Sequence, residues 1–153
     1  MVFRRQETRI GVRAMLLTYG KLDVSELQAT TQADVLVAVD AGFRVVDGDR
    51  VVYEEPSFPV VELAWSLLRW LDQPARGDFV FDSMSFEELG ALTVRRQGAG
   101  WVFGSVFVPD IASDPVSWGE VERSVRAFTR RVTADLSAVG LDATDVLRYP
   151  PAR

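Results

Sequence analysis

The chain of 153 residues contains no histidine and no cysteine. Histidine is the usual proton shuttle and the commonest metal ligand, and cysteine is the most reactive nucleophile at neutral pH and a soft metal ligand. Their absence excludes a Ser-His-Asp triad, a Cys-His pair, a zinc finger and any disulfide bond. Carboxylates, hydroxyls and the single lysine, Lys21, remain as reactive groups. We therefore expect a binding protein without catalytic residues, cofactor or metal.

Long hydrophobic runs are absent as well. Charged residues interrupt every apolar stretch within about a dozen residues, which is too short to span a membrane. The only apolar patch near the N-terminus, residues 14–17, is too short for the hydrophobic region of a signal peptide. Because 48% of the residues are hydrophobic and 25% are charged, the composition is typical of a globular domain. We expect a cytoplasmic protein with no membrane partner.

The charge is distributed unevenly along the chain. Residues 1–14 carry a net charge of +3 and the whole chain carries −5, which leaves −8 on residues 15–153. This acidic body argues against nucleic acid as a partner and suits a basic protein surface. We interpret residues 1–14 as a basic arm, either disordered or a start-site artefact with Met15 as the true start. Residues 15–149 are then one domain and residues 150–153 a tail.

Hydrophobic periodicity predicts several strands. The valines at 35, 37 and 39 alternate with smaller or polar residues, which is typical of a strand. The tight-turn signal at 47–49 predicts a hairpin in which Val45 pairs with Val51 and Phe43 with Tyr53. Residues 79–82 are predicted as a short strand. Residues 92–97 and 101–107 are predicted as a second hairpin, with Val94 opposite Phe103.

Two main helices are predicted, at about 58–71 with Ser57 as N-cap and at about 115–139 with Asp114 as N-cap. Strands and helices in this order, with tight loops between strands, indicate an α+β fold. We expect an antiparallel sheet of about five to six strands packed with these helices.

The predicted helix at 58–71 is apolar around almost its whole circumference, so it must be covered on more than one side. Its only polar stripe consists of Glu62, Ser66 and Arg69. We expect both Trp65 and Trp70 to be buried within one chain. The alternative is a homodimer that forms through this helix.

Two groups of carboxylates are candidates for function. The pair Glu54-Glu55 is predicted to lie between a strand and a helix, and Asp82, Glu87 and Glu88 lie between two predicted strands. We predict that these five residues form an acidic surface that captures a basic protein. The same carboxylates could instead hold a small molecule or a divalent cation, serve in acid–base chemistry, or have only local roles at a helix N-terminus and a turn. A pocket with converging carboxylates would favour a ligand, and a flat or convex acidic face would favour a protein.

Several segments resemble a family of actinobacterial proteins known only as a domain of unknown function. The resemblance covers about residues 34–148, and the segments that carry it are 53–63, 68–71, 78–88 and 101–107. It implies no activity. The layout of a strand pair, a helix and an acidic segment with flanking phenylalanines also resembles WapI-type immunity proteins. That likeness implies a cytoplasmic acidic protein that blocks a partner by binding to its surface.

Overall fold

The computed structural model of the protein describes residues 14–149, and the statements below concern these residues. They form two three-stranded antiparallel sheets, in the orders β1-β2-β3 and β4-β5-β6, together with four helices. The first sheet contains β1 (Met15–Tyr19), β2 (Ala41–Asp47) and β3 (Arg50–Phe58), and the second contains β4 (Phe79–Val80), β5 (Thr93–Gln97) and β6 (Gly100–Gly104). The helices are α2 (Gln32–Ala38), α3 (Val60–Leu71), α4 (Trp118–Ala138) and α5 (Ala143–Val146).

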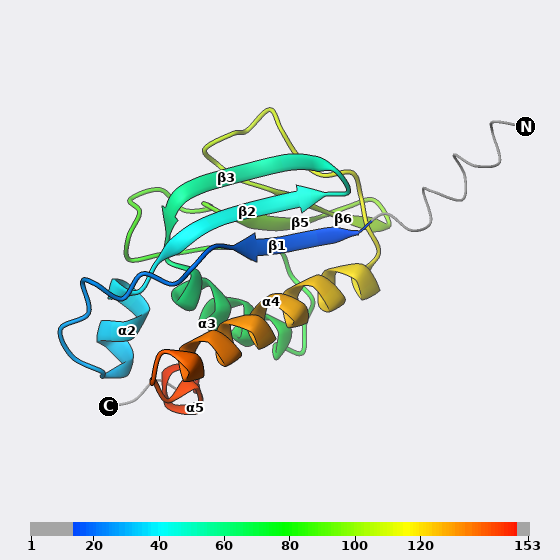
Figure 1. Cartoon of the computed structure of the whole chain (residues 1–153). Helices are drawn as coiled ribbons and strands as arrows, with labels where there is room; N and C mark the ends of the chain where they lie inside the picture. Colours follow the sequence, from blue (N-terminus) through cyan, green and yellow to red (C-terminus); the bar gives the residue numbers. More distant parts are fainter. Residues whose placement is uncertain (1–13, 150–153) are drawn as a thin grey trace, which may run out of the picture.

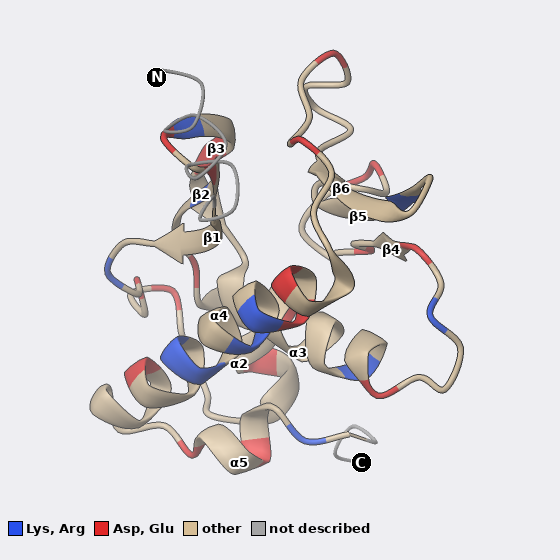
Figure 2. Ribbon diagram, turned by 90° about the vertical axis from the view of Figure 1, so that its right-hand side faces the viewer, with Lys and Arg blue, Asp and Glu red and all other residues tan. Residues whose placement is uncertain are grey.

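The predicted α+β class is confirmed, but the predicted single sheet of five to six strands is wrong. Backbone bridges from Ala112 and Val116 occupy the outer edge of β6. The outer edge of β3 pairs with no further strand among the described residues. The two sheets therefore remain separate, and they stand side by side above the helices, as Figure 2 shows. In the view of Figure 1, β1–β3 lie in front of β5 and β6.

Residues 32–38 form helix α2, so the predicted strand around Val35, Val37 and Val39 is wrong. The buried valines at 35 and 39 are four residues apart, a spacing that fits one face of a helix as well as one face of a strand. The N-cap decides between them, because the Thr31 side chain accepts a hydrogen bond from the backbone N–H of Asp34.

The hairpin between β2 and β3 exists, but its predicted register is wrong. Asp47 lies opposite Arg50, so the turn has two residues, and Gly48 adopts a left-handed conformation with φ 66°. A bulge follows, and Val45 pairs with Tyr53 instead of Val51. The extra residue of the bulge places two consecutive side chains, at 52 and 53, in the core. In the second hairpin, the predicted pairing of Val94 with Phe103 is confirmed.

Both predicted main helices are present, although their N-caps differ from the prediction. Ser117 caps α4 in place of Asp114, because the backbone of Val116 pairs with Trp101 and delays the start of the helix. Ser57 does not cap α3, since its hydroxyl donates to Asp40 at 2.7 Å. Gly140, with φ 86°, follows the end of α4 as predicted.

The two tryptophans of α3 have different environments, so the prediction that both are buried holds only for Trp70. Trp70 is 6% exposed, and its indole N–H donates to the Gly77 carbonyl at 2.8 Å. Trp65 is partly buried, and its indole N–H donates to the Arg148 carbonyl at 3.0 Å. The ring of Tyr149 lies 6.2 Å from that of Trp65. The chain's own C-terminal segment thus covers this face of α3, and a homodimer through the helix stays a prediction that the packing does not require.

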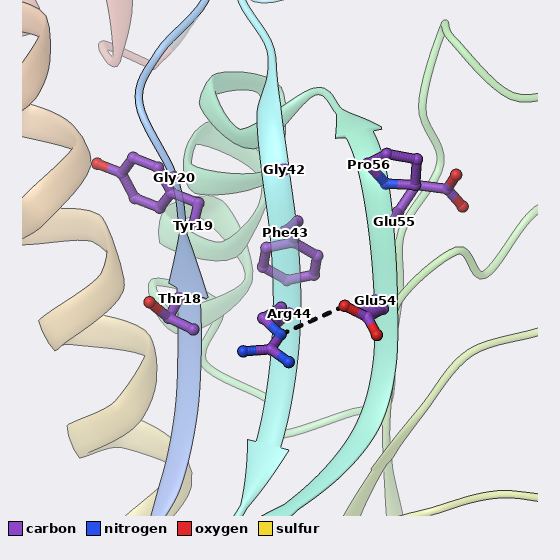
Figure 3. A pocket seen from close by; sticks show the side chains of 9 residues that line it. All are labelled: Thr18, Tyr19, Gly20, Gly42, Phe43, Arg44, Glu54, Glu55 and Pro56. Atoms are coloured by element: carbon purple, nitrogen blue, oxygen red, sulfur yellow. Dashed lines mark ion pairs between the residues drawn. The ribbon is translucent and has the colours of Figure 1, made fainter.

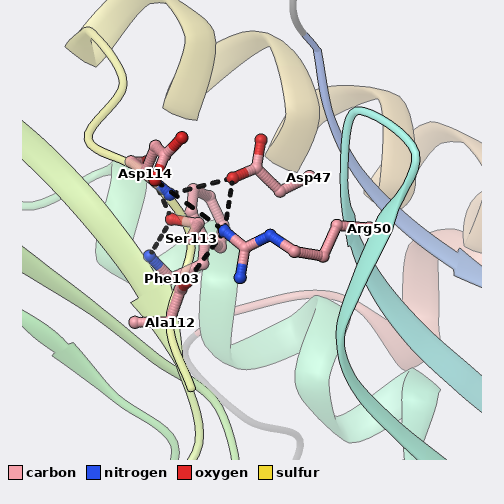
Figure 4. A network of polar contacts seen from close by, with 6 residues as sticks. All are labelled: Asp47, Arg50, Phe103, Ala112, Ser113 and Asp114. Carbon is pink, nitrogen blue, oxygen red and sulfur yellow. Dashed lines mark hydrogen bonds and ion pairs between the residues drawn. The ribbon is translucent and has the colours of Figure 1, made fainter. Parts of the chain in front are cut away.

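A polar network links the two sheets (Figure 4). The fully buried side chain of Asp47, at the end of β2, accepts from the Asp114 backbone N–H at 2.8 Å and from Arg50 at 3.3 Å. Arg50 also donates to the Ala112 carbonyl, and Ser113 accepts from the Phe103 N–H of β6. The turn of the first sheet is therefore tied to the segment that covers the edge of the second.

Side chains of α4 cover part of the outer edge of β1. The Met15 N–H donates to Glu120 at 2.8 Å, and Arg123 donates to the Met15 carbonyl at 3.0 Å. Glu120 and Arg123 also form an ion pair at 2.6 Å. The expected basic arm, residues 1–14, lies outside the described residues except for Ala14, whose carbonyl accepts from the Gly48 N–H.

This arrangement predicts a pH-dependent contribution of Glu120 to stability. The hydrogen bond from Arg123 lowers the pKa of Glu120 below its ordinary value of 4.5, although partial burial opposes the shift. A lowered pKa in the folded state means that the stabilisation is present above the unfolded-state pKa and is lost as the pH falls through the folded-state pKa. We expect Glu120→Gln to reduce the free energy of unfolding by about 1 kcal/mol at neutral pH and by less at an acidic pH below the ordinary pKa of 4.5.

Urea denaturation at both pH values measures this difference. Glu122→Gln is the matched control on the same helix, because the ion pair of Glu122 with Arg126 involves a more exposed carboxylate than that of Glu120. Its effect should stay within about 0.5 kcal/mol. A loss in the Glu120 variant that is unchanged from neutral to acidic pH would contradict the predicted linkage.

Candidate functional site

A closed loop at residues 82–89, here called the acidic loop, contains three of the five predicted site residues. Its ends are joined, because the Gly90 N–H donates to the Phe81 carbonyl at 2.8 Å. Phe81 is fully buried, and its own N–H donates to Leu92. Gly90 has φ 94°, a left-handed conformation that side chains disfavour. The base of the loop is therefore set by the core and the second sheet.

Glu62 of α3 anchors the first half of the acidic loop. It is only 4% exposed, so its predicted place in a solvent-facing polar stripe is wrong. One carboxylate oxygen accepts from the Ser83 hydroxyl at 2.7 Å, and the other accepts from the Met84 N–H at 3.0 Å. The Ser83 hydroxyl oxygen in turn accepts from the Ser85 N–H at 2.9 Å. A buried carboxylate is thus satisfied by the loop that it holds.

Phe86 anchors the second half of the loop. Its ring lies 5.6 Å from that of Phe58, at the end of β3, and 5.4 Å from that of Phe107. These contacts place the acidic loop beside the end of the first sheet. With Phe81, Ser83 and Phe86 turned inward, the exposed members of the loop include Asp82, Met84, Glu87, Glu88 and Leu89. Within residues 14–149, none of the carboxylates of Asp82, Glu87 and Glu88 forms an ion pair.

Glu54 and Glu55 lie inside β3, not between a strand and a helix as predicted, because the strand continues past Pro56 to Phe58. Neighbouring strand residues point to opposite faces. Glu54 pairs with Arg44 at 3.4 Å on the outer face of the sheet, whereas Glu55 points away from that face and accepts from the Tyr53 hydroxyl at 3.0 Å (Figure 3). Burial, and then this hydrogen bond, raise the pKa of the Tyr53 hydroxyl.

The five predicted carboxylates therefore do not converge on one point. In the part of the chain that the structure describes, no group of three acidic residues is arranged so that it could hold a metal ion. Asp82, Glu87 and Glu88 share the acidic loop, and the contact between Phe86 and Phe58 brings β3 alongside it. The exposed carboxylates of the acidic loop therefore lie beside the end of β3, whereas Glu54 and Glu55 point to opposite faces of that strand.

Two grooves lie on the outer faces of the sheets. The first, of about 460 Å³, crosses β1–β3, with Gly20 and Gly42 in its lining and with Arg44 and Glu54 beside them (Figure 3). The second, of about 350 Å³, lies on β5 and β6 and on the loops that flank them. We call the second one the apolar groove, because its lining includes Leu89, Val102, Val106, Pro109 and Ile111.

The apolar groove was not expected from the sequence. Residues 101–107 were predicted as one strand. In the structure β6 ends at Gly104, and Val106 and Ile111 are each 44% exposed. Leu89, which belongs to both the acidic loop and this groove, is 58% exposed. The only signal in the sequence is the row of aliphatic residues after Gly104, which are too close together to turn inward at once.

The structure thus defines a two-sheet α+β protein with an anchored acidic loop next to an apolar groove. The chain belongs to the family described as "Domain of unknown function (DUF7878)", which matches residues 15–138. The predicted membership of a family of unknown function is therefore confirmed, and the match includes β1 but neither the basic arm nor α5. No curated protein and no solved structure matches the chain. Actinobacterial origin and the likeness to WapI-type immunity proteins stay predictions.

No helix among the described residues is long and apolar enough to cross a membrane.

Proposed function

We propose that the protein is a non-catalytic binding protein, immunity-like or adaptor-like, that captures a basic protein partner through the predicted carboxylates Glu54, Glu55, Asp82, Glu87 and Glu88. The three residues of the acidic loop are the centre of this surface, because Glu54 already pairs with Arg44 and Glu55 accepts from Tyr53. The observation that carries this proposal is that buried Glu62 anchors the acidic loop. Its carboxylate accepts hydrogen bonds from the Ser83 hydroxyl and from the Met84 N–H. A loop that is ordered before binding loses little conformational entropy when a partner docks. The carboxylates of the loop are thus presented in one arrangement.

The surroundings of these carboxylates support a protein partner. Asp82, Glu87 and Glu88 are exposed, and no ion pair within residues 14–149 neutralises them. Met84, in the same loop, is 66% exposed. Exposed apolar side chains next to charged ones are typical of protein-binding surfaces, in which apolar contacts give affinity and charges give orientation and association rate. A cytoplasmic location stays a prediction that suits this function.

The alternative is a small-molecule or divalent-cation binding protein that uses the same carboxylates. The groove of about 460 Å³ beside Glu54 is the one observation in its favour. In that groove Arg44 already pairs with Glu54, and Glu55 points away. A ligand would therefore meet a neutralised carboxylate and not a converging pair, so we favour the protein partner.

Charge reversal tests the proposed function, with fluorescently labelled decalysine as the probe. In Asp82→Lys/Glu87→Lys/Glu88→Lys, we expect the association rate at low salt to fall by about tenfold or more and its salt dependence to disappear. The fold should survive, because exposed charges contribute little stability. Stopped-flow measurements at two ionic strengths give both quantities.

A second triple reversal is the matched control, since it changes the net charge by the same amount. It replaces Glu26, Asp49 and Asp72 with lysine, three exposed carboxylates outside the proposed surface. Its association rate should change much less. If both triple variants lose the same amount, only the net charge of the protein matters, and the acidic surface has no special role.

A further inference from the structure

The exposed aliphatic side chains of the apolar groove are gathered on one face and not scattered over the surface. The Val106 N–H donates to the Gly90 carbonyl at 2.8 Å, which holds the loop after β6 against the acidic loop. A methyl group at Gly90 would lie 3.6 Å from Val106 and 3.7 Å from Val80, so these two valines flank the same point. Leu89 and Ile111 continue the lining. Single exposed apolar residues are ordinary on proteins, but a contiguous patch marks a contact surface.

Gly104, the buried last residue of β6, also lies in the lining of the groove. The backbone of Gly104 is not left-handed, so other residues could adopt its conformation. A methyl group at this position would meet the Thr93 hydroxyl at 3.5 Å and the Ala112 methyl group at 4.0 Å, which are ordinary contacts. Backbone geometry therefore does not require glycine at this position.

The charges around the groove favour a basic occupant. Glu87 and Glu88 directly precede Leu89 in the acidic loop, and Asp110 lies between Pro109 and Ile111 of the lining. Arg95, the one cationic residue among the described residues of the lining, forms an ion pair with Asp78 at 3.8 Å. An apolar floor with carboxylates beside it complements an amphipathic segment that has aliphatic side chains on one face and lysine or arginine beside them.

A second copy of this chain fits the same surface poorly. In a two-fold dimer the same patch of each copy faces the other, so Glu87, Glu88 and Asp110 would approach their own equivalents. The chain as a whole has a net charge of −5, which adds to that repulsion.

We propose that the apolar groove receives the aliphatic side chains of an amphipathic, lysine- or arginine-rich segment of the partner protein. This inference rests on the proposed function, because the acidic loop would hold the basic side chains of the same segment. Leu89 links the two surfaces, as it lines the groove and follows the two glutamates. Affinity would then come from the groove, and the association rate from the acidic loop.

The test uses three labelled peptides with the full chain: an amphipathic leucine–lysine helix of about 14 residues, the same peptide with glutamate in place of lysine, and decalysine. Fluorescence anisotropy gives the affinities, and backbone amide shifts show which residues each peptide contacts. The groove variant is Leu89→Ser/Ile111→Ser. The control variant is Val24→Ser/Val139→Ser, two valines that are 37% and 44% exposed and lie outside the groove.

We expect the leucine–lysine peptide to bind at least about tenfold more tightly than decalysine, with shifts at the groove residues. The groove variant should bind the leucine–lysine peptide no more tightly than decalysine, and its affinity for decalysine should equal that of the wild type. The control variant should keep the tenfold preference for the leucine–lysine peptide. The glutamate peptide should not bind.

Three results would overturn the inference. In the first, the groove variant binds the leucine–lysine peptide as tightly as the wild type. If decalysine binding still depends on the carboxylates of the acidic loop, the proposed function stands and only the proposal for the groove is wrong. In the second, the glutamate peptide binds as well as the lysine peptide, so the occupant is not basic. In the third, sedimentation shows a wild-type dimer that the groove variant converts to a monomer, so a second copy covers the groove.

Discussion

Trp70→Ala is expected to lower the free energy of unfolding by about 3–5 kcal/mol, the usual range for a large aromatic core residue. The ring of Trp70 lies 5.4 Å from Phe79, 6.2 Å from Trp101 and 5.3 Å from Trp118. These neighbours come from β4, β6 and α4, so the indole joins α3 to the second sheet and to the long helix. Its loss would leave a cavity and remove the hydrogen bond to Gly77.

Trp65→Ala is the matched comparison on the same helix. Trp65 is only partly buried and contacts Arg148, Tyr149 and Arg69, whose guanidinium carbon lies 4.4 Å from the Trp65 ring. We expect the loss of the Trp65 side chain to reduce the free energy of unfolding by about 1–2 kcal/mol. The loss is smaller than for Trp70 because folding removes less of the apolar area of Trp65 from water. Urea denaturation of both variants measures the two losses. Equal losses would contradict the environments described here, and a dimer of the wild type that Trp65→Ala dissociates would restore the homodimer through α3.

Glu62→Ala is expected to reduce the free energy of unfolding by about 2–4 kcal/mol, since it leaves two donors without their acceptor. The Ser83 hydroxyl and the Met84 N–H both point at the carboxylate, at 2.7 and 3.0 Å. The exposed Glu122→Ala on α4 is the control and should cost much less. The alanine variant should also speed hydrogen exchange at the Met84 and Ser85 amides, because the acidic loop loses its anchor.

Glu62→Gln separates hydrogen bonding from the simple loss of a side chain. The amide oxygen can accept from Met84, and the amide group can donate to the Ser83 oxygen if the hydroxyl turns. We therefore expect this variant to keep stability within about 1 kcal/mol of the wild type. If alanine and glutamine cost the same, the carboxylate is not the anchor of the loop, and the main support for the proposed function is lost.

Local patterns in the sequence predict much of the secondary structure. Helices α3 and α4 follow from apolar spacing, and the pairing of Val94 with Phe103 follows from the loop around Gly98. Prediction of secondary structure fails where the same apolar positions fit both the period of a strand and the period of a helix. Valines at 35 and 39 suit both a strand and a helix, and the distinction rests on the hydrogen bond between Thr31 and Asp34.

The candidate site could be predicted only in part. The sequence names the acidic residues of the loop, but it also places Glu62 on an outer polar stripe, because a glutamate on a helix is usually solvated. Its burial depends on Ser83 and Met84, which lie more than twenty residues away. The pair Glu54-Glu55 reads as one acidic unit, and the strand that contains it turns the two side chains to opposite faces.

Composition and local spacing by themselves determined the chemical class of groups available, the acidic charge of residues 15–153, the two long helices and the presence of the two hairpins. Only the tertiary structure decided that the six strands form two sheets, that buried Glu62 holds the acidic loop, and that residues of two loops line one apolar groove. The reason is physical. Periodicity and turn chemistry act over a few neighbouring residues, whereas strand edges, buried hydrogen bonds and surface grooves are made by groups that only folding brings together.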